Sequence, residues 1–264
     1  MLVLCLCMSG AAAAGFERTT QPPRALAGGG GGWFTNPEDA FCRNPSFLAA
    51  VRDCRSTVFY HPSPFGLTQL SGGGVLVVVP TGYGMLGCRG TTTGFSLYRE
   101  VTGTAAASYR LTESLALGTA LTMDHVSIAG YGSAVAVEID LGISVLLSDM
   151  CNWNVSATNI ARATLGSGED PLPQFHSTGI EYAPLPEIHI VSELAKEIRY
   201  PASLAVSTVI TPMDAFSITA GVCTEPSRFC GGFEVRAFSL RLGYAVLTHA
   251  ELGLSHIISC SFQF

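Results

Sequence analysis

The chain has 264 residues, of which 48% are hydrophobic and 13% are charged, and its formal net charge is −6. Soluble domains usually carry about 25% charged residues, but no run of about 18 apolar residues follows the N-terminus, which excludes a bundle of transmembrane helices. The sequence also has no basic stripe, so nothing supports nucleic-acid binding.

The first residues predict an export signal. "MLVLCLCMSGAAAAG" joins an apolar segment to small residues, and Ala12-Ala13-Ala14 fits the small-x-small pattern of a cleavage site. We therefore assign residues 1–14 to a signal peptide and expect the mature chain to begin near Gly15 or Phe16. No Lys or Arg precedes the apolar stretch, and a buried N-terminal helix is the alternative.

Residues 15–52 predict a short plug, or hatch, before the main domain. After the glycines Gly28–Gly32, the stretch "NPSFLAA" offers Asn44 as an N-cap and Pro45 as the first residue of a short helix that runs through Val51. The glycine run lacks the preceding strand and the Lys-Ser/Thr of a phosphate-binding loop. A flexible linker is the alternative to a plug. The residues expected in the plug are Asn44, Pro45, Phe47 and Leu48.

Residues 53–264 predict strands. The clearest is "AVAVEIDLGISV", residues 134–145, in which β-branched residues or Leu alternate with small or acidic ones. A period of two over this length predicts one long strand with two unlike faces, and about 9–11 tilted residues cross a bilayer. Similar stretches recur, about 14 in total, give or take two. We therefore predict an all-β fold, a transmembrane antiparallel β-barrel.

The small and polar face of these strands is predicted to line the lumen, and the aliphatic face to meet lipid. A soluble β-sandwich also alternates, but its strands usually have about 5–6 residues, whereas several here are about twice as long. Charged residues on the small-residue face are candidates for ligand binding in the lumen. They are Arg110, Asp124, Glu138, Asp140 and Arg241.

Nine cysteines are present, and seven remain after the predicted signal peptide, so at least one thiol is free. Cys223 and Cys230 flank the turn-like stretch "TEPSRF" and form a possible disulfide; Cys42 and Cys54 form another possible pair. Because no CxxC or HxxxH spacing occurs in the mature chain, we predict no metal site, and we expect no cofactor.

The chain ends with "LGLSHIISCSFQF", an alternating strand whose last residue is aromatic. A glycine-rich start, an acidic spacer and "NPSFLA", together with this ending, resemble FadL-like outer-membrane barrels, most closely the PorV/PorQ-type branch. The ending matches at Leu252, Gly253, Ser255, His256 and Phe264, whereas Ser46 and Phe47 replace the Ala and Gly of the family pattern.

The resemblance implies an outer-membrane protein of a Gram-negative bacterium, with the lipid bilayer and the barrel-assembly machinery as partners. It implies that the last strand carries the assembly signal. The signal residues would be Leu252, Gly253, His256, Phe262 and Phe264. It also implies the uptake or passage of a small hydrophobic molecule through a plugged lumen. The alternatives are a PorV-like docking or shuttle component that binds a type IX secretion protein, and a purely structural barrel.

Two features of the lumen and loops would separate these functions. A lumen lined by large apolar side chains favours transport, and a filled lumen with large outer loops favours docking. We do not predict an enzyme: His125 and Ser133 lie near one hairpin, but the spacing of a nucleophile elbow is absent, and such chemistry needs a Ser and a His oriented by a third group.

Overall fold

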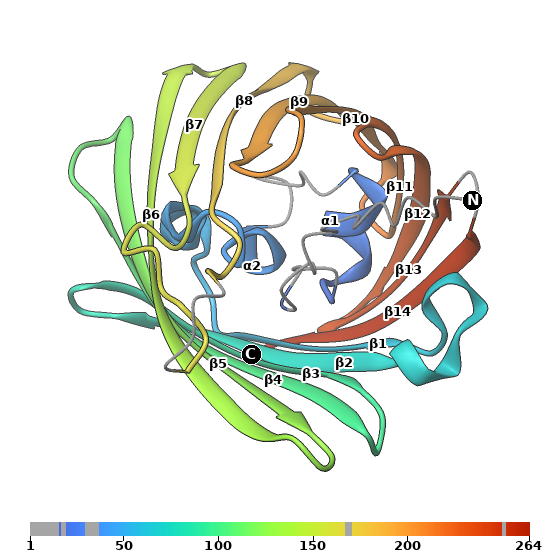
Figure 1. Ribbon diagram of the computed structural model, residues 1–264. Helices are drawn as coiled ribbons and strands as arrows, with labels where there is room; N and C mark the ends of the chain where they lie inside the picture. Colours follow the sequence, from blue (N-terminus) through green and yellow to red (C-terminus); the bar gives the residue numbers. More distant parts are fainter. Residues whose placement is uncertain (1–15, 17–19, 30–36, 167–170, 250–251) are drawn as a thin grey trace, which may run out of the picture.

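The computed structural model describes residues 16, 20–29, 37–166, 171–249 and 252–264, which form one closed barrel around an N-terminal segment (Figure 1). The predicted signal peptide, residues 1–14, lies outside the described residues. Within the described part, no helix is both long and apolar enough to cross a membrane.

Fourteen antiparallel strands make the barrel, as predicted, and each pairs with its neighbours in sequence. Because the single sheet closes on itself, a sandwich of two sheets is excluded. The strands are β1 (Arg55–His61), β2 (Gly72–Thr81), β3 (Gly84–Gly94), β4 (Tyr98–Arg110), β5 (Leu115–Ile128), β6 (Gly132–Ser148), β7 (Cys151–Ala157), β8 (Phe175–Leu185), β9 (Ile188–Glu197), β10 (Ser203–Met213), β11 (Phe216–Thr224), β12 (Ser227–Ala237), β13 (Leu240–His249) and β14 (Gly253–Gln263).

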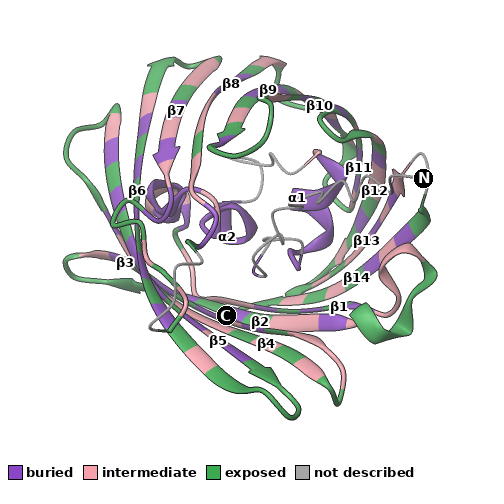
Figure 2. Ribbon diagram, viewed as in Figure 1, coloured by how far each residue is buried: buried purple, intermediate pink, exposed green. Residues whose placement is uncertain are grey.

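The two faces of the strands differ as the alternation predicts. In β6, Val135, Val137 and Ile139 point outward and are 46%, 50% and 39% exposed. Between and beside them, Glu138 and Asp140 point inward and are each 3% exposed. Figure 2 shows the same alternation of buried and exposed residues along many of the strands. The barrel therefore has an apolar outside and a polar inside, the arrangement of membrane barrels.

The last strand is not left bare, because β14 pairs with β1 from Arg55↔Gln263 to Tyr60↔Ile258. Closure removes the unpaired edge that would otherwise template aggregation. Ile257 breaks the apolar alternation of β14 because it points inward, fully buried, and packs in one cluster with Leu26 of the interior segment.

Three short helices form the interior segment: α1 (Pro23–Ala27), α2 (Pro37–Ala40) and the 3-10 helix η1 (Pro45–Ala50). Figure 1 shows α1 and α2 inside the ring of strands. η1 begins after Asn44, whose Oδ1 accepts a hydrogen bond from the Ser46 N–H at 3.0 Å. Two further 3-10 turns, η2 (Pro64–Gly66) and η3 (Thr68–Leu70), lie in the β1–β2 connection.

The predicted disulfide between Cys223 and Cys230 is not formed. Across the β11–β12 ladder Cys223 faces Arg228 and Cys230 faces Gly221, so the two cysteines are offset by two residues rather than opposite. Diagonal neighbours lie about 7–8 Å apart between Cα atoms, beyond the usual reach of a disulfide. All seven cysteines within the described ranges are free thiols, including the alternative pair Cys42 and Cys54.

Candidate functional site: the plugged interior of the barrel

Small residues on the inner wall make room for η1. A Cβ atom at Gly118 of β5 would overlap the Pro45 backbone, and one at Gly142 of β6 would overlap the Asn44 side chain. Asn44 in turn donates from Nδ2 to the Val155 carbonyl oxygen at 3.2 Å. Gly118 and Gly142 therefore leave the space that Asn44 and Pro45, at the start of η1, occupy.

The predicted plug residues all lie inside the ring. Phe47 and Leu48 are 1% and 0% exposed. Leu48 shares a cluster with Phe59 of β1 and Leu76 of β2. At about 1.5–3 kcal/mol for each fully buried side chain of this size, these contacts hold η1 against the wall.

An ion network fastens α1 and α2 to the wall. Glu38, 1% exposed, accepts from Arg55 Nη1 at 2.6 Å and from Arg241 Nη1 at 2.7 Å. Arg24 of α1 lies 3.4 Å from Glu234 of β12. Because these pairs join the interior segment to β1, β12 and β13, the network holds the segment to strands at both ends of the sequence.

Burial and neighbouring charges shift the pKa values of this segment in opposite directions. Burial alone would raise the pKa of Glu38, but the cations of Arg241 and Arg55 hold it below its usual value. Burial raises the pKa of Asp39 well above its usual value, and the charges of Glu38 and Glu234 add to that rise. The network thus stabilises the charge of Glu38, whereas the surroundings of Asp39 disfavour its charge.

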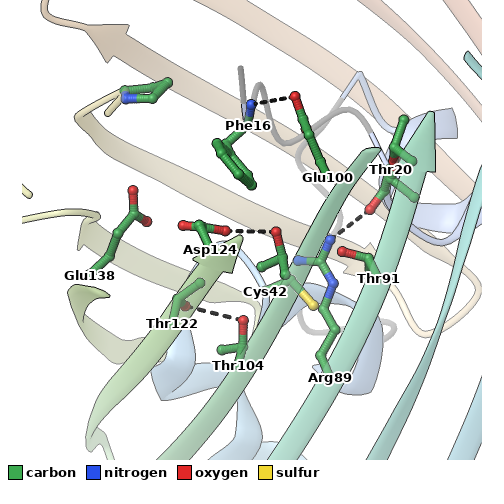
Figure 3. A pocket seen from close by; sticks show the side chains of 13 residues that line it. Phe16, Thr20, Cys42, Arg89, Thr91, Glu100, Thr104, Thr122, Asp124 and Glu138 are labelled. Atoms are coloured by element: carbon green, nitrogen blue, oxygen red, sulfur yellow. Dashed lines mark hydrogen bonds between the residues drawn. The ribbon is translucent and has the colours of Figure 1, made fainter. Parts of the chain in front are cut away.

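A polar cavity of about 40 Å³ lies between the interior segment and the inner faces of β3, β4, β5 and β6 (Figure 3). Six of its lining residues are threonines, and Thr102 Oγ1 donates to Asp124 Oδ1 at 2.6 Å. Arg89 donates from Nη2 to the Thr20 carbonyl oxygen at 2.6 Å. At about 10–15 Å³ for each water, the cavity has room for about three water molecules.

This cavity differs from the lumen that the transport hypothesis predicts. Pockets for small organic ligands usually measure about 300–1,000 Å³ and are largely apolar. Here the space is small, and its walls carry Arg89, Glu100, Asp124 and Glu138. The space is therefore small and mostly polar, and Phe16 is the one large apolar side chain among its described lining residues.

Besides the cluster around Leu48, apolar side chains also gather toward the end of the barrel opposite Arg55 and Phe264, which we call the loop end. Phe16, Val126, Ala136 and Leu172 form a buried cluster, termed here the apolar cluster. Val126 and Ala136 come from the inner faces of β5 and β6, whereas Leu172 comes from the connection between β7 and β8. An apolar surface thus lies inside the wall.

The wall beside the apolar cluster is only partly closed by strand pairing. β7 pairs with β6 from Ser148↔Cys151 to Leu141↔Ala157 and ends there, whereas β6 continues to Gly132. The described part of the β7–β8 connection lies against this stretch of β6: the Ile160 N–H donates to the Ile139 carbonyl oxygen at 3.0 Å, and the Gly166 N–H donates to the Val135 carbonyl oxygen at 3.2 Å. We call the stretch of the wall at residues 132–140 of β6, which have no partner in β7, the β6–β7 seam.

The five predicted lumen residues lie in separate places. Asp124 and Glu138 both line the cavity. Asp140 accepts from the Asn159 N–H at 2.9 Å, beside the seam. Arg241 belongs to the ion network with Glu38. Arg110 is exposed and donates to the Ala49 carbonyl oxygen at 2.9 Å, at the end of η1. Only Asp124 and Glu138 share one site.

Sequence reasoning missed Arg89 and Glu100 in the cavity and Glu38 in the network. The first two could have been found, because they share the parity of the inward positions in "GCRGTTTG" and "YREVTGT". Glu38 gives no such signal, since its partners Arg55 and Arg241 lie far away in sequence. In the described residues no cluster of His, Cys, Asp and Glu could hold a metal ion.

No family model matches the sequence, and no curated protein matches it either. Solved structures match the fold. This chain has the fold of the FadL-type hydrocarbon channels. A structure titled "CymD monoaromatic hydrocarbon channel" superposes with a TM-score of 0.70 at 12% identity over 94% of this chain and 99% of that one.

Two further structures of this type give similar values. The toluene transporter TodX of Pseudomonas putida has a TM-score of 0.64 and 12% identity, over 92% of this chain and 97% of that chain. A FadL homologue of Pseudomonas aeruginosa has a TM-score of 0.65 and 10% identity, over 93% and 98%. At these identities the likeness shows the fold alone.

Proposed function

We propose that this protein is a plugged channel in the outer membrane of a Gram-negative bacterium and that it passes small hydrophobic molecules. CymD and TodX, whose titles name a monoaromatic hydrocarbon channel and a toluene transporter, share its fold. The observation that carries the proposal is the apolar cluster at the loop end, which lies directly inside the β6–β7 seam.

The outer surface supports placement in a bilayer. Its strands expose aliphatic side chains, and exposed aromatic residues lie in the turns at both ends. Tyr83 and Phe238, in the β2–β3 and β12–β13 turns, are 91% and 109% exposed, and Tyr131 at the loop end is 91% exposed. Aromatic girdles at both interfaces flank the apolar band of membrane barrels.

Residues 15–52 would act as the plug, and they decide the route. η1 and the ion network occupy the barrel on the Arg55 side of the cavity. The cavity walls are mostly polar and charged. An apolar molecule would lose affinity among these groups, because their desolvation is unfavourable. The favourable route enters at the loop end, passes the apolar cluster and leaves sideways through the β6–β7 seam into the bilayer.

The last strand would carry the assembly signal. Phe262 of β14 and Phe264, the residue after the strand, are 43% and 75% exposed, and their rings lie 4.7 Å apart. Leu252, Gly253 and His256 lie at the other end of β14. We infer that the barrel-assembly machinery binds this aromatic end before β14 pairs with β1.

The test measures uptake of a radiolabelled monoaromatic hydrocarbon by Gram-negative cells that produce the protein. Ala136→Trp fills the apolar cluster from an inward position that is 5% exposed, and should reduce uptake to the level of cells without the protein. The matched control Val137→Trp adds the same ring to the next residue, which points outward and is 50% exposed, and should leave uptake unchanged. Heat-modifiable migration on gels confirms that both variants fold.

Equal uptake by both variants and by the wild type would contradict the route, and no uptake above background by the wild type would contradict the function. A PorV-like docking role has weaker support. Most loop-end connections are short, such as residues 95–97, 129–131 and 225–226. A co-purifying stoichiometric protein partner would favour docking instead.

A further inference from the structure

Phe16, which precedes α1, lies inside the barrel. Its side chain is 7% exposed and belongs to the apolar cluster. Its backbone nitrogen donates to Glu100 Oε1 at 3.2 Å (Figure 3). Tyr98 donates from its hydroxyl to the same oxygen at 2.5 Å. The Glu100 carboxylate of β4 therefore accepts a hydrogen bond from the backbone N–H of Phe16.

The sequence places a cleavage pattern immediately before this nitrogen. Ala13 and Gly15 are small residues three and one positions before Phe16, as a leader peptidase requires. Hydrolysis of the amide between Gly15 and Phe16 would consume one water molecule. It would leave a carboxylate on Gly15 and convert the Phe16 nitrogen into a free α-ammonium group.

We propose that the chain is cleaved between Gly15 and Phe16 during export and that the new α-ammonium of Phe16 binds Glu100 as an ion pair. This N-terminal clamp ties the start of the interior segment to β4 at the loop end. The clamp goes beyond the proposed function, since it does not depend on what passes through the barrel.

The surroundings suit a cation at this point. Glu100, Asp124 and Glu138 line the cavity beside the Phe16 nitrogen, and Arg89 is the guanidinium among the lining residues that the structure describes. An ammonium has three donors where an amide has one, and a charged donor strengthens each hydrogen bond to a carboxylate. Processing would thus convert one neutral contact into a charge-assisted one.

Burial fixes the order of events. In the closed barrel Phe16 is 7% exposed, so the residue that would follow the cleaved bond is covered. We therefore expect cleavage to precede closure of the barrel around the segment. Folding would then carry the new terminus into the cavity and protect it.

The first experiment determines the terminus. The full chain is exported with its own leader and purified in detergent, and intact mass and N-terminal peptides are read by mass spectrometry. We expect Phe16 as the first residue. A mature chain that begins at Gly15 or elsewhere overturns the proposal.

The second experiment measures access to the α-amine. Lys196 is the single lysine of the chain and is exposed, so the processed protein carries two amines and one of them is an internal reference. An amine-reactive ester is applied near pH 7, and the modified fractions of Phe16 and Lys196 are compared. Only the unprotonated amine reacts, and free α-amines titrate at about pH 7.7–8.0.

In Glu100→Gln the α-amine should react at least tenfold faster than in the wild type, with Lys196 unchanged. The matched control Glu113→Gln removes an exposed carboxylate in the β4–β5 turn and should match the wild type. If Glu100→Gln does not fold, the wild type is compared before and after unfolding, and the same tenfold increase is expected. Equal α-amine reactivity in these comparisons overturns the clamp.

Discussion

We expect one substitution at Glu38 to weaken the docking of the interior segment. Glu38 is 1% exposed and lies between Arg55 and Arg241, at 2.6 Å and 2.7 Å. Glu38→Gln keeps the shape of the side chain and removes its charge. The two guanidinium groups, 19% and 13% exposed, then face a neutral amide.

The magnitude follows from the two pairs. With charge centres about 4 Å apart and an effective dielectric of about 20, each pair is worth about 4 kcal/mol, or about 8 kcal/mol together. Neutralising the carboxylate recovers its desolvation cost, several kcal/mol and here taken as about 5 kcal/mol. The net loss is about 3 kcal/mol, which is about a 100-fold increase in the population of the undocked segment.

Cys42 reports this population. It lies between α2 and η1 and is 6% exposed, so a thiol reagent reaches it only when the segment opens. We expect alkylation of Cys42 to be about 100-fold faster in Glu38→Gln. Cys223 of β11, also 6% exposed, should react at an unchanged rate because the strands hold it.

Asp53→Asn is the matched control, since Asp53 is 46% exposed and 3.9 Å from Arg55. Exposed pairs of this kind contribute about 0–1 kcal/mol, so Cys42 alkylation should change less than about fivefold. If Glu38→Gln labels Cys42 no faster than Asp53→Asn does, the ion network does not hold the segment, and the reasoning is refuted.

The same network predicts a dependence on pH. The pKa of Glu38 is lowered, so its contribution to docking is complete above about pH 4.5 and is lost as the pH falls through the lower, docked value. The pKa of Asp39 is raised, so docking becomes stronger as the pH falls through that raised value. Hydrogen exchange of residues 37–52, corrected for intrinsic rates, should therefore show maximal protection in mild acid. In Glu38→Gln the decrease below about pH 4.5 should diminish. Protection that is flat with pH in the wild type would contradict the assignment.

Two further substitutions test the close contact between Gly118 and the start of η1, and the exposure of the outward face of β6 to lipid. Gly118→Ala places a methyl group against the Pro45 backbone and should increase hydrogen exchange in residues 44–51, whereas Gly103→Ala, which meets nothing within 4 Å, should not; unchanged exchange in Gly118→Ala would exclude the close contact. Val137→Arg puts a charge at the middle of the outward face of β6 and should lower the free energy of unfolding in bilayers by about 2–4 kcal/mol. Tyr131→Arg, at a turn tip, should cost less than about 1 kcal/mol, and equal costs would show that lipid does not surround β6.

The strand pattern was readable from the sequence because it is local. Each residue of a strand faces the side opposite to its neighbours, so "AVAVEIDLGISV" assigns Glu138 and Asp140 to the interior without knowledge of any partner. The same alternation, repeated along the chain, predicted about 14 strands, whereas the closure of the barrel was expected from the resemblance to outer-membrane barrels. The capped start of η1 was also local, since Asn44 bonds to Ser46, two residues away.

The site depended on contacts between distant parts of the chain. The alternation along a strand predicts which side a residue faces, but it does not predict which distant residue it contacts. Arg241 reaches Glu38 across 203 positions, and Phe16 reaches Glu100 across 84. The predicted pairing of Cys223 with Cys230 failed for a related reason: the ladder register, which the sequence does not state, offsets them by two residues. The alternation of side chains determined the barrel, whereas only the packing of the interior segment against the wall decided which charges meet and where the lumen is filled.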